Sequence, residues 1–193
     1  MPTQIERSAQ TQQDLLTAAE MQIAEHGYAA LSEGRICARA GVTRGALRHH
    51  YPSGRYDLLP MLLEQLIERQ SAELAAAGPI DPRERVYLML YGILNNPAQS
   101  NLLVILEIWM ATRGDAKLAT RINPILTTMF ERVFGAAADQ NLAPDILAIR
   151  LTLTGACMHR LGHDDGHEGV VRAVQWILER LPPPPEFARR FLS

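Results

Sequence analysis

The chain has 193 residues, of which 47% are hydrophobic and 21% charged, as in an ordinary globular protein of one or two small domains. Its net charge of −2 at pH 7 excludes nucleic-acid binding driven by overall charge, so such affinity needs a local basic patch. Two cysteines, no signal-peptide pattern and no apolar run of membrane-spanning length favour a soluble cytoplasmic protein without a membrane partner.

The first predicted helix runs from about Gln10 to His26, after a polar N-terminus that we expect to be frayed over residues 1–8. Apolar residues recur at helical spacing between Leu15 and Ile23. Gly27 is the residue expected to end the helix, because glycine adopts the backbone conformations that follow a helix C-terminus.

The next stretch predicts two short helices joined by a tight turn, which is a helix-turn-helix. Ser32 and Thr43 suit the N-caps, because a side-chain hydroxyl can accept from an unpaired backbone N–H. Gly41 can supply the positive φ of the turn, and Leu47 and Tyr51 share an inward face at i, i+4. In such a motif the second helix presents its N-terminal residues to base edges in the major groove of DNA.

Positive charge is concentrated in this same stretch. Residues 34–56 contain five arginines, two histidines and no acid, whereas residues 1–60 as a whole carry six basic and six acidic side chains. Such a patch is expected where a phosphate backbone lies, although a solvated arginine-rich helix pair is the alternative. The residues predicted to contact DNA are Ser32, Thr43, Arg44, Gly45, Arg48, His49, His50 and Arg55.

Beyond residue 55 the apolar spacing is helical and no strand pattern appears. Six further helices are expected, at about residues 55–76, 82–95, 102–111, 116–138, 144–161 and 166–181. The predicted fold class is therefore all-α, with about nine helices.

The last two predicted helices favour a two-fold dimer. The helix at 144–161 is apolar on nearly every side and the helix at 166–181 has an apolar arc, so one subunit cannot cover both. Two such pairs would form a four-helix bundle. The predicted interface consists of Leu151, Thr154, Gly155, Met158, Val170, Val174 and Ile177.

Arg150 lies at the centre of the apolar arc of the helix at 144–161. A buried arginine needs a partner, since an unpaired buried charge costs several kcal/mol. Glu107 is a candidate. Two interpretations remain open, an anchor for an anionic effector and a structural ion pair or snorkelling side chain.

No catalytic or cofactor-binding set emerges, so we expect neither an enzyme nor a cofactor. His159, His163 and His167 follow each other at four-residue spacing, which metal ligands can adopt. However, Gly162 and Gly166 would break a helix holding all three on one face, so the sequence predicts a loop and no metal site.

The residues IleCysAlaArgAlaGlyValThrArgGlyAlaLeuArgHisHisTyrPro from Ile36 to Pro52, preceded by AlaGluHisGlyTyr, resemble the tetracycline-repressor (TetR) family of transcriptional regulators. The resemblance covers about residues 10–70. It departs at Arg48, where tyrosine is usual, at Tyr51, where phenylalanine is usual, and at Arg55, where a lysine often stands. The resemblance implies a repressor that binds a palindromic double-stranded DNA operator as a homodimer and is released by a small-molecule effector.

The resemblance also implies a helix-turn-helix domain at residues 1–55 and a ligand-binding and dimerisation domain at residues 56–193. Methionines suit an adaptable effector pocket. The pocket residues expected there are Leu62, Leu66, Leu90, Leu106, Glu107, Trp109, Met110, Met129, Phe130 and Arg150. Two alternatives are an all-α small-molecule-binding protein or enzyme without operator binding, and a non-specific architectural DNA-binding protein.

Overall fold

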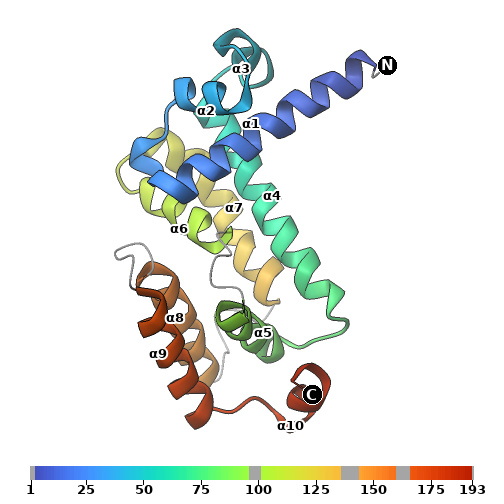
Figure 1. Cartoon of the computed structure of the whole chain (residues 1–193), viewed down its shortest axis with the longest axis vertical. Coiled ribbons are helices and arrows are strands. Elements are labelled where there is room, and N and C mark those ends of the chain that lie inside the picture. The colour runs from blue at the N-terminus through green and yellow to red at the C-terminus, as the bar shows by residue number, and fades with distance from the viewer. Residues whose placement is uncertain (1–2, 96–100, 136–143, 160–165, 193) are drawn as a thin grey trace. The chain divides into compact units, whose positions relative to one another are not determined.

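The computed structural model describes residues 3–95, 101–135, 144–159 and 166–192. The all-α prediction is confirmed, since these residues contain ten α-helices, one 3-10 helix and no strand (Figure 1). The helices are α1 (Gln4–His26), η1 (Tyr28–Ala30), α2 (Glu33–Ala40), α3 (Arg44–His50), α4 (Arg55–Ala76), α5 (Pro82–Asn95), α6 (Asn101–Ala111), α7 (Ala116–Phe134), α8 (Pro144–His159), α9 (Gly166–Arg180) and α10 (Pro185–Phe191).

The chain forms two compact units. The first, here the head unit, comprises residues 1–68 and 104–127, and the second, here the cavity unit, comprises residues 69–103 and 128–193. Helices α4, α6 and α7 each contribute residues to both units. This division is one of packing, and the functional division at residue 55 stays a prediction.

In the head unit, α1 packs against α2 and α3 (Figure 1). The helix begins six residues earlier than expected, and its N-terminal turn is not frayed from Thr3 onward. The reason is a capping box: Thr3 Oγ1 accepts from Glu6 N at 3.2 Å, and Glu6 Oε2 accepts from Thr3 N at 2.6 Å. These two reciprocal bonds satisfy donors that would otherwise be unpaired at the helix end.

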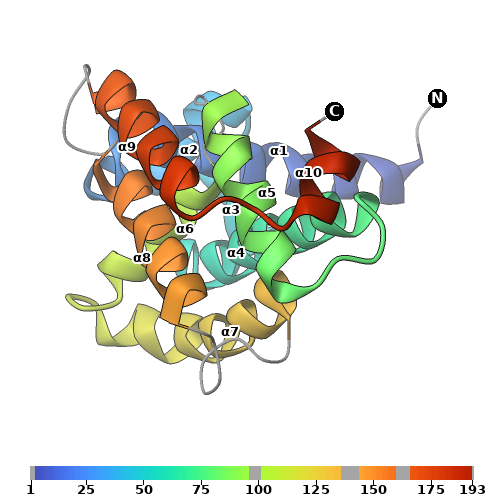
Figure 2. The ribbon, with the colours of Figure 1, turned by 90° about the horizontal axis from the view of Figure 1, so that it is seen from below.

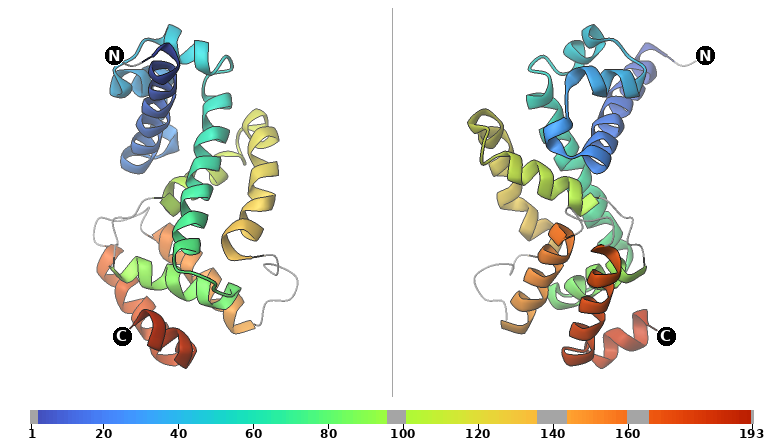
Figure 3. Two further views of the ribbon diagram at one scale, coloured as in Figure 1. Left: turned by 90° about the vertical axis from the view of Figure 1, so that its right-hand side faces the viewer. Right: turned by 60° about the vertical axis from the view of Figure 1, so that its left-hand side comes forward.

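In the cavity unit, α5 packs against α8 and α9, and α8 and α9 lie side by side (Figures 2 and 3). Many of the buried side chains in the interior of this unit are aliphatic. They include Val86, Leu90, Ile149, Leu153, Val170 and Val174.

The C-terminal helix α10 is docked on the cavity unit through Phe187, which is fully buried. Its ring centroid lies 5.8 Å from that of Tyr87 and 4.9 Å from that of Phe191. Arg190 donates to Ala77 O at 2.6 Å through Nη2 and to Pro79 O through Nη1. Burying a phenylalanine contributes about 1.5–3 kcal/mol. The tail is therefore an integral part of the unit.

Candidate DNA-binding site

The caps and the turn of the helix-turn-helix are confirmed. Ser32 Oγ accepts from Arg35 N at 3.3 Å at the start of α2, and Thr43 Oγ1 accepts from Ala46 N at 3.1 Å at the start of α3. Gly41 ends α2 with φ of 67°, in the left-handed region that glycine adopts without steric cost. Local chemistry thus fixes where both helices begin and where the first one ends.

Helix α3 has a buried and an exposed face, as predicted. Leu47 is fully buried and Tyr51, just after the helix, is 4% exposed. His50 is half-buried. The remaining predicted DNA contacts on α2 and α3 are exposed, namely Ser32, Thr43, Arg44, Gly45, Arg48 and His49. Whether these side chains contact DNA stays a prediction.

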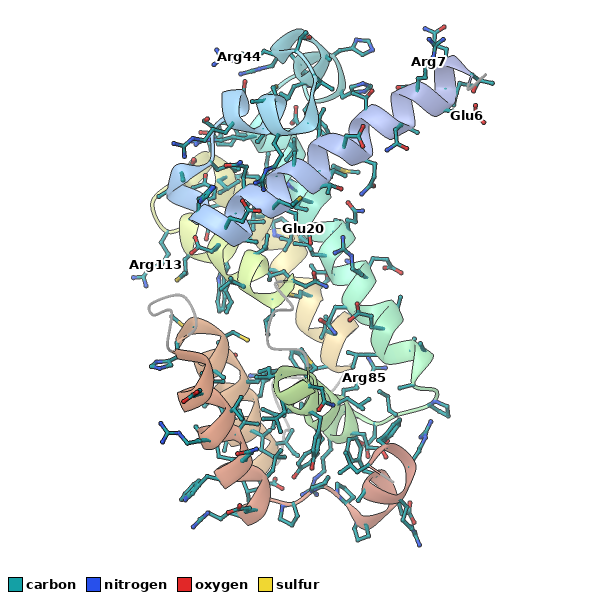
Figure 4. All side chains as sticks on the ribbon, in the orientation of Figure 1. Glu6, Arg7, Glu20, Arg44, Arg85 and Arg113 are labelled. Carbon is teal, nitrogen blue, oxygen red and sulfur yellow. The ribbon has the colours of Figure 1, made fainter. Side chains whose placement is uncertain are left out.

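Arg44 is the first residue of α3, and it is exposed (Figure 4). In the described part of the chain its guanidinium forms no hydrogen bond or ion pair. A Cβ added at Gly34 would lie 2.8 Å from Arg44 Nη2, so the glycine on α2 leaves the space that the guanidinium occupies. The guanidinium of Arg44 therefore lies beside Gly34, exposed and available to a partner.

Arg48, one turn further along α3, is held by the protein itself. Its Nε and Nη2 atoms donate to the two carboxylate oxygens of Glu33 at 3.1 and 2.8 Å. Its Nη1 atom donates to Pro52 O at 2.9 Å. All three nitrogens of the guanidinium are thus used within the chain, although the side chain is 51% exposed.

Arg55, at the start of α4, is also held within the head unit. Its Nη2 atom lies 3.1 Å from Tyr56 Oη and 3.2 Å from Asp115 Oδ2. Asp115 in turn accepts from Leu118 N at 3.0 Å. That backbone hydrogen bond, with further help from Tyr56 and Arg55, holds the pKa of Asp115 below its ordinary value. Arg55 thus joins α4 to the start of α7.

The two remaining arginines of the stretch have partners as well. Arg39 Nη2 lies 2.5 Å from Glu25 Oε2, and this hydrogen bond lowers the pKa of the Glu25 carboxyl. Arg35 Nη1 donates to Ala30 O at 2.9 Å. Three of the five arginines are therefore paired with carboxylates, and the positive patch is smaller than the sequence suggested.

Sequence reasoning missed the acids that neutralise this patch. Glu33 stands one residue before the acid-free stretch, and as the first residue of α2 it could have been recognised as a neighbour of that stretch. Glu25 lies 14 residues from Arg39, and Asp115 lies 60 residues from Arg55. No local pattern pairs residues so far apart, so only the folded structure identifies these two.

Glu107 ties α6 to the end of α1 within the head unit. Its Oε2 atom accepts a hydrogen bond from Tyr28 N at 2.9 Å, and its carboxylate lies close to Gly27. The sequence made Glu107 a candidate partner for Arg150. The structure gives it a backbone N–H as a partner, which explains how one carboxylate is accommodated on an otherwise apolar helix.

The cavity unit contains a pocket of about 220 Å³. Its lining is mostly apolar, with Gln70, Glu73 and Asn101 as polar groups, and it includes Cys157. The remaining lining residues are Leu74, Ala77, Leu88, Met89, Gly92, Ile93, Leu102 and Leu153. The volume is below the range of about 300–1,000 Å³ typical of drug-sized ligands, so it suits a small molecule.

The effector-pocket residues expected from the sequence are not the residues of this cavity. Leu62, Leu66, Leu90, Leu106 and Met129 are buried, Glu107 and Arg150 are half-buried, and Trp109 and Met110 are exposed. None of these nine lines the cavity. The side chain of Phe130 lies outside the described residues.

The predicted dimer face is only partly exposed. On α8, Leu151 is 62% and Met158 48% exposed, and on α9 Trp176 is 56% exposed. Leu147 and Gly155 are also exposed, whereas Thr154 and Ile177 are half-buried.

The structure does not place Val170 and Val174 on the predicted dimer face. They are 4% and 0% exposed, because they point into the core of their own unit, so they cannot form the seam. Trp176, which is not among the predicted interface residues, lies exposed on the same helix instead.

The predicted loop after α8 lies largely outside the described residues. His159 is exposed on the last turn of α8, His163 lies outside the described residues, and so does the side chain of His167. Within the described ranges, the side chains form no group of three or more His, Cys, Asp and Glu that could hold a metal. In those same ranges no helix combines the length and the apolar character needed to cross a bilayer.

Residues 15–59 match the family model described as "Bacterial regulatory proteins, tetR family". The chain is 42% identical over 82 residues to the HTH-type transcriptional regulator CymR of Pseudomonas putida, which covers 41% of this chain and 40% of that protein. It is 32% identical over 142 residues, 70% of each chain, to an uncharacterised HTH-type transcriptional regulator of Mycobacterium tuberculosis. Both relatives are named as regulators and not as enzymes.

Solved structures agree on the fold. A TetR-family transcriptional regulator from Rhodococcus sp. superposes with a TM-score of 0.66 at 18% identity, covering 88% of this chain and 97% of that one. A protein from Saccharomonospora viridis, described as a transcriptional regulator in complex with choline, has a TM-score of 0.60 at 20% identity, covering 89% and 96%. The family model, the relative aligned over 70% of its length and the capped helix-turn-helix agree, and the chain belongs to the TetR family of bacterial regulatory proteins.

Proposed function

We propose that the protein is a repressor that binds a palindromic DNA operator as a two-fold dimer and is released by a small-molecule effector. The observation that carries the DNA-binding part is Arg44. It is exposed at the start of α3 and has no hydrogen bond or ion pair within the described residues. An arginine placed there in a helix-turn-helix can donate to a guanine in the major groove.

The neighbours of Arg44 suit the rest of the interface. Among the described residues, a Cβ added at Gly45 would meet only Thr43 Oγ1, at 3.6 Å, so a phosphate can approach the backbone closely. His49 and His50 lie beside each other with ring centroids 5.2 Å apart. Thr43 is exposed and, like Ser32, retains a hydroxyl hydrogen to donate while its oxygen serves as a cap.

The experiment that tests this function is selection of a binding sequence from random duplex DNA, followed by titration of Arg44→Ala with the recovered duplex. The variant is expected to lose about 1–3 kcal/mol of operator affinity and to relax one operator position. The matched control is Arg113→Ala, which removes the same charge from an exposed position in the turn between α6 and α7 (Figure 4). Failure to recover any preferred sequence would contradict the proposal.

The dimer is supported by the exposed apolar residues of α8 and α9. Leu147, Leu151 and Met158 recur on one side of α8, and Trp176 is exposed on α9. Gly155 has no heavy atom of the described chain within 4 Å of an added Cβ, so a helix of a second subunit can approach closely there. A two-fold dimer presents two α3 helices to half-sites roughly 34–36 Å apart.

The effector is proposed to bind in the cavity of about 220 Å³. Its apolar walls and few polar groups are typical of small-molecule sites, and a structural neighbour is described in complex with choline, itself a small molecule. Arg150, which the sequence offered as an anchor for an anionic effector, does not line this cavity, whereas Glu73 does.

Gly92 offers a clean test of the cavity. It lines the space, and no heavy atom of the described residues lies within 4 Å of an added Cβ. Gly92→Leu is expected to fill the cavity, to leave operator binding unchanged and to abolish release by effector. Gly92→Ala is the matched control, because its single methyl leaves most of the volume free. If Gly92→Leu responds to effector as the parent does, the effector binds elsewhere.

A further inference from the structure

The side chains of Glu33, Arg48 and the backbone around Gly54 form one connected cluster, which we call the α3 latch. Glu33 begins α2, Arg48 lies near the end of α3, and Gly54 lies in the turn between α3 and α4. The Arg48 guanidinium binds both carboxylate oxygens of Glu33, at 3.1 and 2.8 Å, and Pro52 O at 2.9 Å. This bidentate geometry fixes the guanidinium plane as well as its position.

Gly54 completes the latch because it has no side chain. A Cβ there would lie 1.9 Å from Glu33 Oε1 and 3.1 Å from Arg48 Cζ, and its φ is 61°. Gly54 N also donates to Tyr51 O at 2.7 Å. The turn therefore needs glycine twice, for its backbone conformation and for the space that the ion pair occupies.

We propose that Glu33 and Arg48 are positioning residues for operator recognition, and that Arg48 holds α3 in place instead of reading a base. This inference rests on the proposed function and changes one part of it, the role expected for Arg48 from the sequence. The latch fastens the recognition helix to the start of α2 and to the turn that leads into α4. Three of the five guanidinium N–H donors are used for this, and the Nε–Nη2 pair that would form a bidentate contact with a guanine is already bound to Glu33.

Removing the Glu33 carboxylate tests this proposal, because charge alone and a positioning role predict opposite changes in operator affinity. Glu33 is a carboxylate on the surface proposed to face DNA phosphates, so its removal should by charge alone strengthen binding to any duplex. If Glu33 positions α3 through Arg48, its removal should instead weaken binding to the operator while binding to unrelated DNA stays the same or strengthens. The two explanations predict opposite changes in the same variant.

The experiment measures Glu33→Gln, Arg48→Gln and the double variant against the duplex recovered by selection and a scrambled duplex of the same composition. Each single variant is expected to lose about tenfold in operator affinity, and the double variant no more than either single one. The loss should be spread over all operator positions. Arg48 reading a base would instead relax one position, with Glu33→Gln equal to or tighter than the parent, and that result would overturn the latch.

A glycine pair provides a measurement that needs no DNA. Gly54→Ala and Gly41→Ala both place a methyl at a left-handed position, with φ of 61° and 67°, but only at Gly54 does the methyl meet Glu33. Nothing described lies within 4 Å of a Cβ at Gly41. Gly54→Ala is expected to lower the urea midpoint more than Gly41→Ala, and the excess should shrink in a Glu33→Gln background. Equal midpoints in the two variants would contradict the latch.

These outcomes separate the two proposals. If selection yields no preferred duplex, the proposed function fails, and the glycine pair still decides whether the latch exists. If a duplex is recovered and Glu33→Gln binds it as tightly as the parent does, operator binding stands and the positioning role of Glu33 fails.

Discussion

The helix-turn-helix and the α8–α9 pair differ in whether their exposed side chains have partners within the chain. On the helix-turn-helix, charged groups are exposed but mostly paired. Arg39 and Arg48 have carboxylate partners, Arg35 donates to Ala30 O, and Arg44 forms no hydrogen bond or ion pair within the described residues. On α8 and α9, large apolar side chains such as Leu151 and Trp176 are exposed, and the described chain does not cover them. Most charged groups of the helix-turn-helix thus have partners within the chain, whereas the exposed apolar side chains of α8 and α9 do not have such cover from the described residues.

The difference shows what a partner must supply to each surface. A duplex that meets the helix-turn-helix gains few new charge contacts, because a paired arginine contributes little further attraction. A second subunit that meets α8 and α9 removes apolar area from water, at about 25 cal/mol per Å². The operator affinity of one head unit should therefore be modest, and the proposed dimer would supply the rest through effective concentration.

The largest effect is expected from Val174→Asp, which tests whether the buried and exposed sides of α9 differ as described. Val174 is fully buried, so the variant places a charge in the core of the cavity unit at a cost of several kcal/mol. That is a large part of the roughly 5–15 kcal/mol by which domains are stable. Urea unfolding followed by circular dichroism checks it, and a midpoint near the parent's would contradict the burial.

Leu151→Asp makes the same change on the exposed side of α8. Because Leu151 is 62% exposed, the variant should fold as the parent does but exist as a monomer. Operator affinity should then fall by about 10²–10⁴, the range that avidity gives. Sedimentation and titration with operator check both parts, and Ala72→Asp, at an exposed position on α4, controls for the added charge. A variant that remains a dimer would move the interface elsewhere.

Lowering the pH should weaken the head unit through Asp57. Ser53 N donates to its carboxylate at 2.6 Å and Arg121 pairs with it, and both hold its pKa below the ordinary value of 3.8. A carboxyl with a lowered pKa in the folded state stabilises above its unfolded pKa and loses that contribution as pH falls through the folded value. As the pH falls below about 4, the urea midpoint of the parent should therefore decrease. The decrease should be less steep in Asp57→Asn. Parallel curves would refute this role.

The smallest effect is expected from Arg55→Gln, which asks whether a paired arginine still contacts DNA. A free phosphate contact would change the slope of log affinity against log salt by about one unit. Because Asp115 holds the guanidinium at 3.2 Å, we expect a smaller change. Asp115→Asn, which frees Arg55, is the matched control and should steepen the slope. If the slope of log affinity against log salt instead changes by a full unit in Arg55→Gln, Arg55 contacts a phosphate, in agreement with the DNA contact predicted from the sequence.

Local chemistry explains which parts of this structure the sequence predicted. Ser32, Gly41 and Thr43 act within three or four residues of their own positions, so the ends of α2 and α3 were predicted correctly. The pairing of Arg39 on α2 and Arg55 on α4 was not predicted, because Glu25 and Asp115 come close to these arginines only in the folded chain.

Burial on two-sided helices was equally hard to predict. Helix α9 has an apolar arc, and the sequence cannot say which part of that arc faces its own core. Val174 was therefore assigned to the dimer face although it is buried, and only the packing of α5 and α8 against α9 identifies its side.

Each compact unit contains one cysteine, and both thiols are buried, Cys37 in α2 and Cys157 in the wall of the cavity. A buried thiol reacts after local opening or, at Cys157, through the cavity, so the two labelling rates report on the two units separately. Burial raises the pKa of the Cys37 thiol, which slows its reaction further. The two cysteines thus provide two separate labelling measurements. A molecule bound in the cavity should directly slow the labelling of Cys157, and any change in the labelling rate of Cys37 shows whether that binding also alters the head unit.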